Sequence, residues 1–194
     1  RAVMSAADFS KTSDELMLIA NYLLSLEHEE RAIQLYQQVA KLDPLSNEAY
    51  LAALRAAERC NNLDGIVWAT EGILSRAWPA EMATIEDTAM RVAKATLRKM
   101  DAEGMTQDVA DYRERLSKAL VRDCVIQVSW TGDADIDLVV EEPGGTICSP
   151  THRQTASGGM NLGDTYATQS GQGNSGGFSE TYVCDKGFSG EYRV

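Results

Sequence analysis

Apolar residues recur every three or four positions through the first two thirds of the chain. In 13–26, Leu16, Ile19, Ala20 and Leu23 fall on one stripe at this spacing, which predicts an amphipathic helix. The same pattern, broken by turn residues, predicts five further helices over 29–41, 47–60, 63–75, 80–102 and 106–120. The short connections predict that neighbouring helices run antiparallel.

After residue 122 the pattern changes to alternation between apolar and polar positions. In 124–130 and 135–140, apolar residues alternate with polar ones, which predicts strands. Two more strands are expected over 180–184 and 190–194, with a long polar, glycine-rich loop over 168–179. We therefore predict a fold of class α + β: an antiparallel helical bundle followed by a small antiparallel β-sandwich.

The composition supports the same division. Residues 1–122 carry 15 basic and 19 acidic side chains with three glycines, whereas residues 123–194 carry 3 basic and 10 acidic side chains with twelve glycines. We predict a helical domain over 1–121 and a β-sandwich domain over 122–194. The last strand should continue beyond Val194.

The charge argues against several classes of partner. The net charge is −11 at pH 7, and nucleic acid and anionic membranes both attract clustered lysine and arginine. No apolar run approaches the roughly 20 residues that span a bilayer, so we expect no membrane insertion. No nucleophile, base and orienting group come together in the sequence, so we expect no enzymatic activity.

The helical half has a period near 35 residues, marked by the turn prolines Pro44 and Pro79. In the first unit, small, large and proline positions are occupied in order by Leu16, Ile19, Ala20, Leu23, Ala32, Tyr36 and Pro44. This order resembles the tetratricopeptide repeat. The unit over 47–79 matches less well, because Ile66 and Thr70 stand where a small and an aromatic residue are expected. The resemblance implies stacked helix pairs with a concave surface for protein partners, and a generic helical bundle is the alternative.

The second half contains several short motifs in a fixed order. They are Trp130, Asp135-Ile-Asp137-Leu, Glu142-Pro-Gly-Gly, Cys148, Arg153, Gly158-Gly159, Asp164 and Ser179-Glu-Thr-Tyr182. This order resembles an uncharacterised bacterial β-sandwich family that is similar to the pre-peptidase C-terminal domains of secreted enzymes. The resemblance implies an accessory, non-catalytic module of the cell envelope or of an extracellular protein. The helical repeats suit any compartment, so a cytoplasmic location stays open.

Alternating aspartates form the sharpest candidate site. The candidate ligands are Asp133, Asp135 and Asp137, with Asp164 or Glu180 to complete the set. Carboxylates at alternate strand positions share a face about 6.6 Å apart and repel one another unless a cation or hydrogen-bond donors neutralise them. Oxygen ligands suit calcium. The alternative is a solvated or structural set that accepts backbone N–H bonds or pairs with Arg153.

The four cysteines suggest one disulfide. Cys148 and Cys184 both lie near strand ends of the β-domain, so they are expected to pair if the protein is exported. Cys60 and Cys124 are expected to be buried single thiols. No C-x-x-C spacing occurs, so no zinc site is expected.

These patterns together predict a non-catalytic protein-interaction scaffold or assembly module of a bacterial envelope or extracellular structure. Its partners would be other proteins or further copies of itself, as in a fibre or layer. The alternative is an accessory calcium-binding or carbohydrate-binding region of a larger secreted enzyme.

Overall fold

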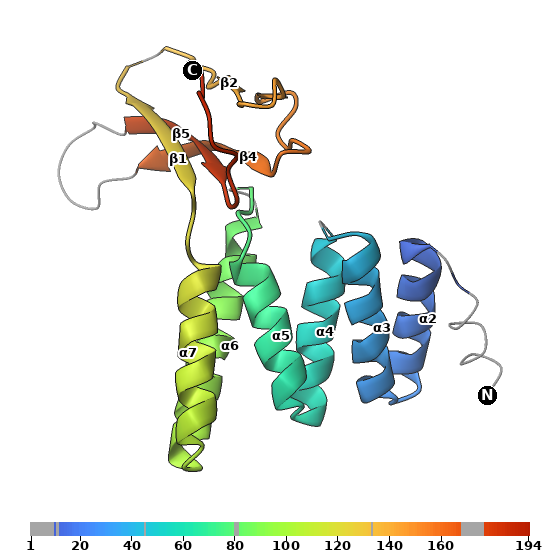
Figure 1. The fold of residues 1–194 in the computed structure, drawn as a ribbon. Coiled ribbons are helices and arrows are strands. Elements are labelled where there is room, and N and C mark those ends of the chain that lie inside the picture. The colour runs from blue at the N-terminus through green and yellow to red at the C-terminus, as the bar shows by residue number, and fades with distance from the viewer. Residues whose placement is uncertain (1–9, 11, 45, 80–81, 133, 168–176) are drawn as a thin grey trace. The chain divides into compact units, whose positions relative to one another are not determined.

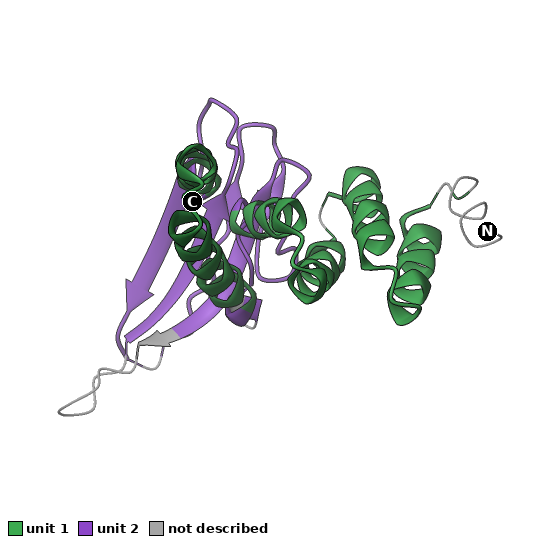
Figure 2. Ribbon diagram, turned by 90° about the horizontal axis from the view of Figure 1, so that it is seen from below, with its two compact units in different colours: residues 1–74, 85–119 green, residues 75–84, 120–194 purple. Residues whose placement is uncertain are grey.

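The computed structural model describes residues 10, 12–44, 46–79, 82–132, 134–167 and 177–194 (Figure 1). Helices fill the first part of the chain and strands the second, which confirms the predicted mixed α + β class. The chain divides into two compact units, coloured separately in Figure 2. Arg1–Leu74 and Ile85–Ala119 make up the helical unit, and Ser75–Thr84 and Leu120–Val194 make up the β unit. The link between the fourth and fifth predicted helices thus belongs to the β unit, which the sequence did not indicate.

The helices lie close to their predicted limits. They are α2 (Ser13–Ser25), α3 (Glu29–Leu42), α4 (Asn47–Cys60), α5 (Leu63–Leu74), α6 (Ala83–Ala102) and α7 (Thr106–Ala119). Their ends follow from capping. Thr12 accepts a hydrogen bond from the Glu15 amide at 3.3 Å at the start of α2, and Asn61 adopts the left-handed conformation that ends α4.

Small residues let neighbouring helices approach closely. Helices α2 to α5 contact one another in chain order and lie side by side in Figure 1. Tyr36 on α3 is fully buried and donates a hydrogen bond to Asn21 Oδ1 on α2 at 2.7 Å. A Cβ atom at Gly72 on α5 would lie 2.1 Å from the ring of Tyr50, which stacks on Trp68. Glycine is therefore required where α5 crosses α4, a role that the repeat pattern had assigned to other positions of α5.

The strands of the β unit form two antiparallel sheets among the described residues. The larger has the order β1 (Cys124–Trp130), β5 (Gly177–Cys184), β4 (Gly159–Ala167), and the smaller pairs β2 (Val140–Glu141) with β3 (Ile147–Cys148). Their buried core consists of Leu138, Val140, Cys148, Tyr182 and Cys184. Whether these sheets form a complete sandwich stays a prediction.

Several strand predictions need correction. The strand expected over 135–140 is paired only at Val140, and β4 was not predicted at all. The expected strand over 190–194 is reduced to a single bridge between Arg193 and Glu141. The expected polar loop ends at Gly177, where β5 begins, and its residues 168–176 lie outside the described part of the chain.

Candidate functional site: a groove in the helical unit

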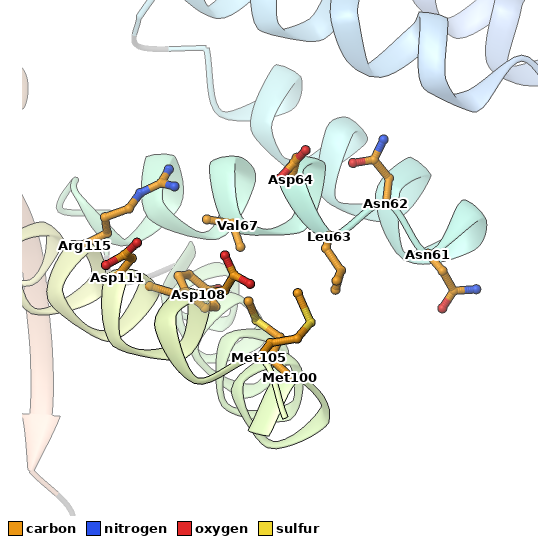
Figure 3. A pocket seen from close by; sticks show the side chains of 11 residues that line it. Asn61, Asn62, Leu63, Asp64, Val67, Met100, Met105, Asp108, Asp111 and Arg115 are labelled. Atoms are coloured by element: carbon orange, nitrogen blue, oxygen red, sulfur yellow. The ribbon is translucent and has the colours of Figure 1, made fainter. Parts of the chain in front are cut away.

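Helices α5 and α7 contact each other through two side-chain pairs, and a groove opens beside this contact. Thr70 and Tyr112 share a hydrogen bond of 2.6 Å, and the Arg115 guanidinium pairs with the Glu71 carboxylate. The groove has a volume of about 520 Å³ (Figure 3). It is lined by Asn61, Asn62, Leu63, Asp64, Val67, Met100, Met105, Asp108, Asp111, Tyr112 and Arg115. This volume falls in the range of roughly 300–1,000 Å³ that is usual for ligand sites.

The floor of the groove is apolar. Val67 and Met100 are buried, and Leu63 and Met105 are partly buried. Methionine is flexible and polarisable, so surfaces built on it adapt to varied apolar side chains. The floor can therefore bury one or more apolar side chains of a ligand.

The rim of the groove is acidic. Asp64, Asp108 and Asp111 are exposed, and none of the three pairs with a basic side chain among the described residues. Asp111 accepts only a neutral hydrogen bond, from Gln107 Nε2 at 2.7 Å. The lone arginine, Arg115, is already held by a carboxylate. The open mouth thus presents uncompensated negative charge above an apolar floor.

Hydrogen bonds within the helical unit hold the side chains of the groove walls in place. Asn62 Oδ1 accepts the Gly65 amide at 2.7 Å and so caps the start of α5. Burial raises the pKa of Tyr112, the nearby Glu71 charge adds to this rise, and the Thr70 hydrogen bond and the Arg115 charge only partly oppose it. Tyr112 therefore stays protonated and acts as part of the wall.

The predicted calcium ligands do not converge within the described residues. Asp133 lies outside the described part of the chain, and Asp135, Asp137 and Asp164 are exposed. No group of three or more histidine, cysteine or acidic side chains in the described ranges is placed to hold a metal ion. Calcium binding at these positions stays a prediction.

Two buried glutamates in the β unit, Glu142 and Glu180, each accept several hydrogen bonds. Glu142 was not predicted as a site residue, and Glu180 was expected only as a candidate calcium ligand. Glu142 is 3% exposed and accepts hydrogen bonds from Tyr182 at 2.7 Å, from Thr155 at 2.8 Å and from Thr146. Burial alone would raise the pKa of Glu142, but hydrogen bonds from the surrounding hydroxyl groups, Thr146 first among them, lower that pKa below its ordinary value. Glu142 thus ties the turn after β2, the loop before β4 and strand β5 together.

Glu180 anchors the chain before β2 in the same manner. Its carboxylate accepts the Leu138 amide and Asn161 Nδ2, the latter at 2.9 Å. Asn161 Oδ1 in turn accepts the Gly163 amide at 2.8 Å. Charged residues are normally assigned to the surface, so the sequence did not predict that Glu142 and Glu180 are buried. Because the carboxylates of Glu142 and Glu180 are buried and hydrogen-bonded, they stabilise the fold of the β unit.

The predicted disulfide partners lie in one core. All four cysteines carry free thiols in the structure, and Cys148 and Cys184 belong to the same buried cluster. Burial and then the Glu142 charge raise the pKa of Cys148 to about 11. The expectation of buried single thiols was wrong for Cys60, which is exposed. Cys124 is partly buried and faces Cys184 directly across the β1–β5 pair. The Cys148–Cys184 pairing stays a prediction.

No family model, curated protein or solved structure matches this chain. Across the described ranges, every helix is too short or too polar to cross a membrane.

Proposed function

We propose that this chain is a non-catalytic protein-interaction scaffold whose helical unit binds a segment of a partner protein in the groove between α5 and α7. The observation that carries the proposal is an open groove of about 520 Å³ with an apolar floor. Tyr112 in the lining is held by its hydrogen bond to Thr70, which supports a fixed binding surface.

Selection of binding peptides, followed by methyl NMR, tests this proposal. A displayed library of random peptides is selected on the whole chain, and the enriched peptides are titrated into protein labelled at its seven methionine methyl groups. The expected result is that the Met100 and Met105 signals shift with saturation. Enriched peptides that leave both signals unmoved would refute the groove as the binding site.

A matched pair of variants controls this experiment. Met105→Gln places a polar group on the groove floor, whereas Met82→Gln changes an exposed methionine that does not line the groove. We expect Met105→Gln to weaken peptide binding and Met82→Gln to leave it unchanged. Equal effects of the two substitutions would contradict the proposed site.

We further propose that the protein works in the cell envelope or outside the cell and that copies of it assemble. The motif order of the β unit supports this proposal. Light scattering of the purified chain over a range of concentrations, with and without calcium, measures assembly directly. A strict monomer at high concentration in both conditions would overturn it.

A further inference from the structure

We infer that the groove selects a basic segment of a protein partner, with lysine or arginine beside the acidic rim and apolar side chains on the floor. This inference rests on the proposed function and names the chemistry of the partner. It follows from the charge of the groove lining, the position of that charge on two walls, and the apolar floor between them.

The charge balance of the groove favours a cation. Arg115 is its only basic side chain, and both Nε, at 3.0 Å, and Nη2 donate to Glu71 Oε2. That pair is internally neutral. Asp64, Asp108 and Asp111 remain, so a basic side chain entering the groove meets three carboxylates and a guanidinium that is already compensated.

The acidic residues of the lining come from two helices. Asp64 belongs to α5, and Asp108 and Asp111 belong to α7 (Figure 3). Asp64 and Asp108 also lie in the first turns of their helices, where negative charge stabilises the helix dipole. Asp111 lies beyond the first turn and has no such role. An incoming cation would therefore be contacted from two helices rather than from one helix end.

The apolar floor favours a protein segment over a simple polycation as the ligand. Leu63, Val67, Met100 and Met105 offer contacts that only apolar side chains use. A partner that carries both leucine-like or methionine-like side chains and basic side chains satisfies floor and rim together. A polyamine would engage the rim alone.

Three peptides of equal length and identical leucine and methionine positions test the inference. Their remaining positions carry lysine, glutamine or glutamate, and binding is followed on the Met100 and Met105 methyl signals. We expect the lysine peptide to bind most tightly and the glutamate peptide least tightly, with the preference falling as salt is added. Spermine is titrated in parallel and should leave both methyl signals nearly unmoved.

Matched charge variants separate the groove from the overall acidity of the chain. Asp108→Asn with Asp111→Asn removes two rim charges, whereas Glu48→Gln with Asp87→Asn removes two exposed charges that do not line the groove. Exposed ion pairs are individually weak, so the rim variant should weaken lysine-peptide binding by about two- to thirty-fold. The control variant should change binding less than about two-fold.

Each outcome has one meaning. If none of the three peptides moves the Met100 and Met105 signals, the proposed function itself fails. If all three bind the groove equally, or if both variants weaken binding equally, the groove stands and its preference for a basic segment is refuted. If spermine moves the methyl signals as strongly as the lysine peptide, the assignment to a protein segment is overturned.

Discussion

Replacing Gly159 with alanine should destabilise the β unit because the new methyl group has no room. A Cβ atom at this position would lie 2.0 Å from Glu142 Oε1 and 2.6 Å from the Tyr182 hydroxyl oxygen. These two oxygens share a hydrogen bond of 2.7 Å. The methyl group must therefore displace the Glu142 carboxylate from Tyr182 and from Thr155.

The size of the effect follows from the bonds that are lost. Hydrogen bonds to a charged group contribute about 1.5–3 kcal/mol each, so losing the bonds from Tyr182 and Thr155 costs about 3–6 kcal/mol. Replacing glycine by alanine in an extended strand by itself gains about 0.5–1 kcal/mol. We therefore expect Gly159→Ala to lower the free energy of unfolding of the β unit by about 2–5 kcal/mol.

Gly144→Ala is the matched control. A Cβ atom at Gly144 would meet only Ser157 Oγ, at an ordinary contact distance of 3.6 Å, and the backbone there is not left-handed. We expect this variant to change stability by no more than about 0.5 kcal/mol. Both substitutions add one methyl group to the same unit, so their difference isolates the contact with the carboxylate.

Fluorine NMR of 5-fluorotryptophan-labelled protein in increasing urea provides the assay. The chain has three tryptophans: Trp68 reports on the helical unit, and Trp78 and Trp130 report on the β unit. Gly159→Ala should lower the urea midpoint of the Trp130 signal and leave that of Trp68 nearly in place. Equal Trp130 midpoints for Gly159→Ala and Gly144→Ala would refute the close packing of Gly159 against Glu142.

Three other perturbations follow from the same structure. Gly72→Ala should lower the stability of the helical unit by about 1–3 kcal/mol, because its Cβ would collide with the Tyr50 ring. The urea midpoint of the Trp68 fluorine signal measures this loss, and an unchanged midpoint would contradict the predicted collision. Because the pKa of Glu142 is lowered, its carboxylate adds stability above the unfolded pKa of about 4.3, and this stability is lost as the pH falls through the folded pKa. The stability difference between the native chain and Glu142→Gln should therefore shrink on acidification, which urea unfolding at several pH values measures. A constant difference would argue against an ionised Glu142. If the aspartate cluster binds calcium, adding calcium should raise the melting temperature of the β unit relative to chelator, and Asp135→Asn should abolish the rise; no shift in the native chain would count against the site.

The helices could be predicted from the sequence because their signals are local. Spacing of apolar residues and capping residues act within one or two turns, so limits such as Ser13, Asn47 and Thr106 were placed correctly. The packing partners of the helices could not be placed in this way. Thr70 stands where the repeat pattern expects an aromatic residue, and it bonds to Tyr112 on α7, 42 positions away in the chain.

The strands were less predictable because their pairing is not local. Strand β4 contains two glycines, which by sequence indicate turns. A side chain at Gly159 would strike the buried Glu142 and Tyr182, and Gly163 adopts a positive φ of 82°. The segment before Val140 alternates correctly, but Leu138 donates its amide to the Glu180 side chain and not to a neighbouring strand. Alternation thus predicted burial at this position without predicting a ladder.

The candidate groove could not be found from the sequence at all. Asp64 and Asp108 carry the ordinary signature of helix starts, and Met100 and Met105 that of core residues. These four residues come together only in the folded chain, where they line one groove. A groove forms where packed helices diverge, so it cannot be predicted from the residue pattern of a single helix.

The segment Ser75–Thr84 has a consequence for how this chain can be divided. It runs from the end of α5 into the first residues of α6 and belongs to the β unit. There Asp185 accepts the Ala77 amide at 3.1 Å and pairs with Arg122 at 3.0 Å. The polypeptide therefore passes from one unit to the other at three places, after residues 74, 84 and 119. A single cut in the gene cannot release two intact units. Recombination would therefore transfer both units together. To produce the β unit alone, the ten residues Ser75–Thr84 must be joined to Leu120–Val194.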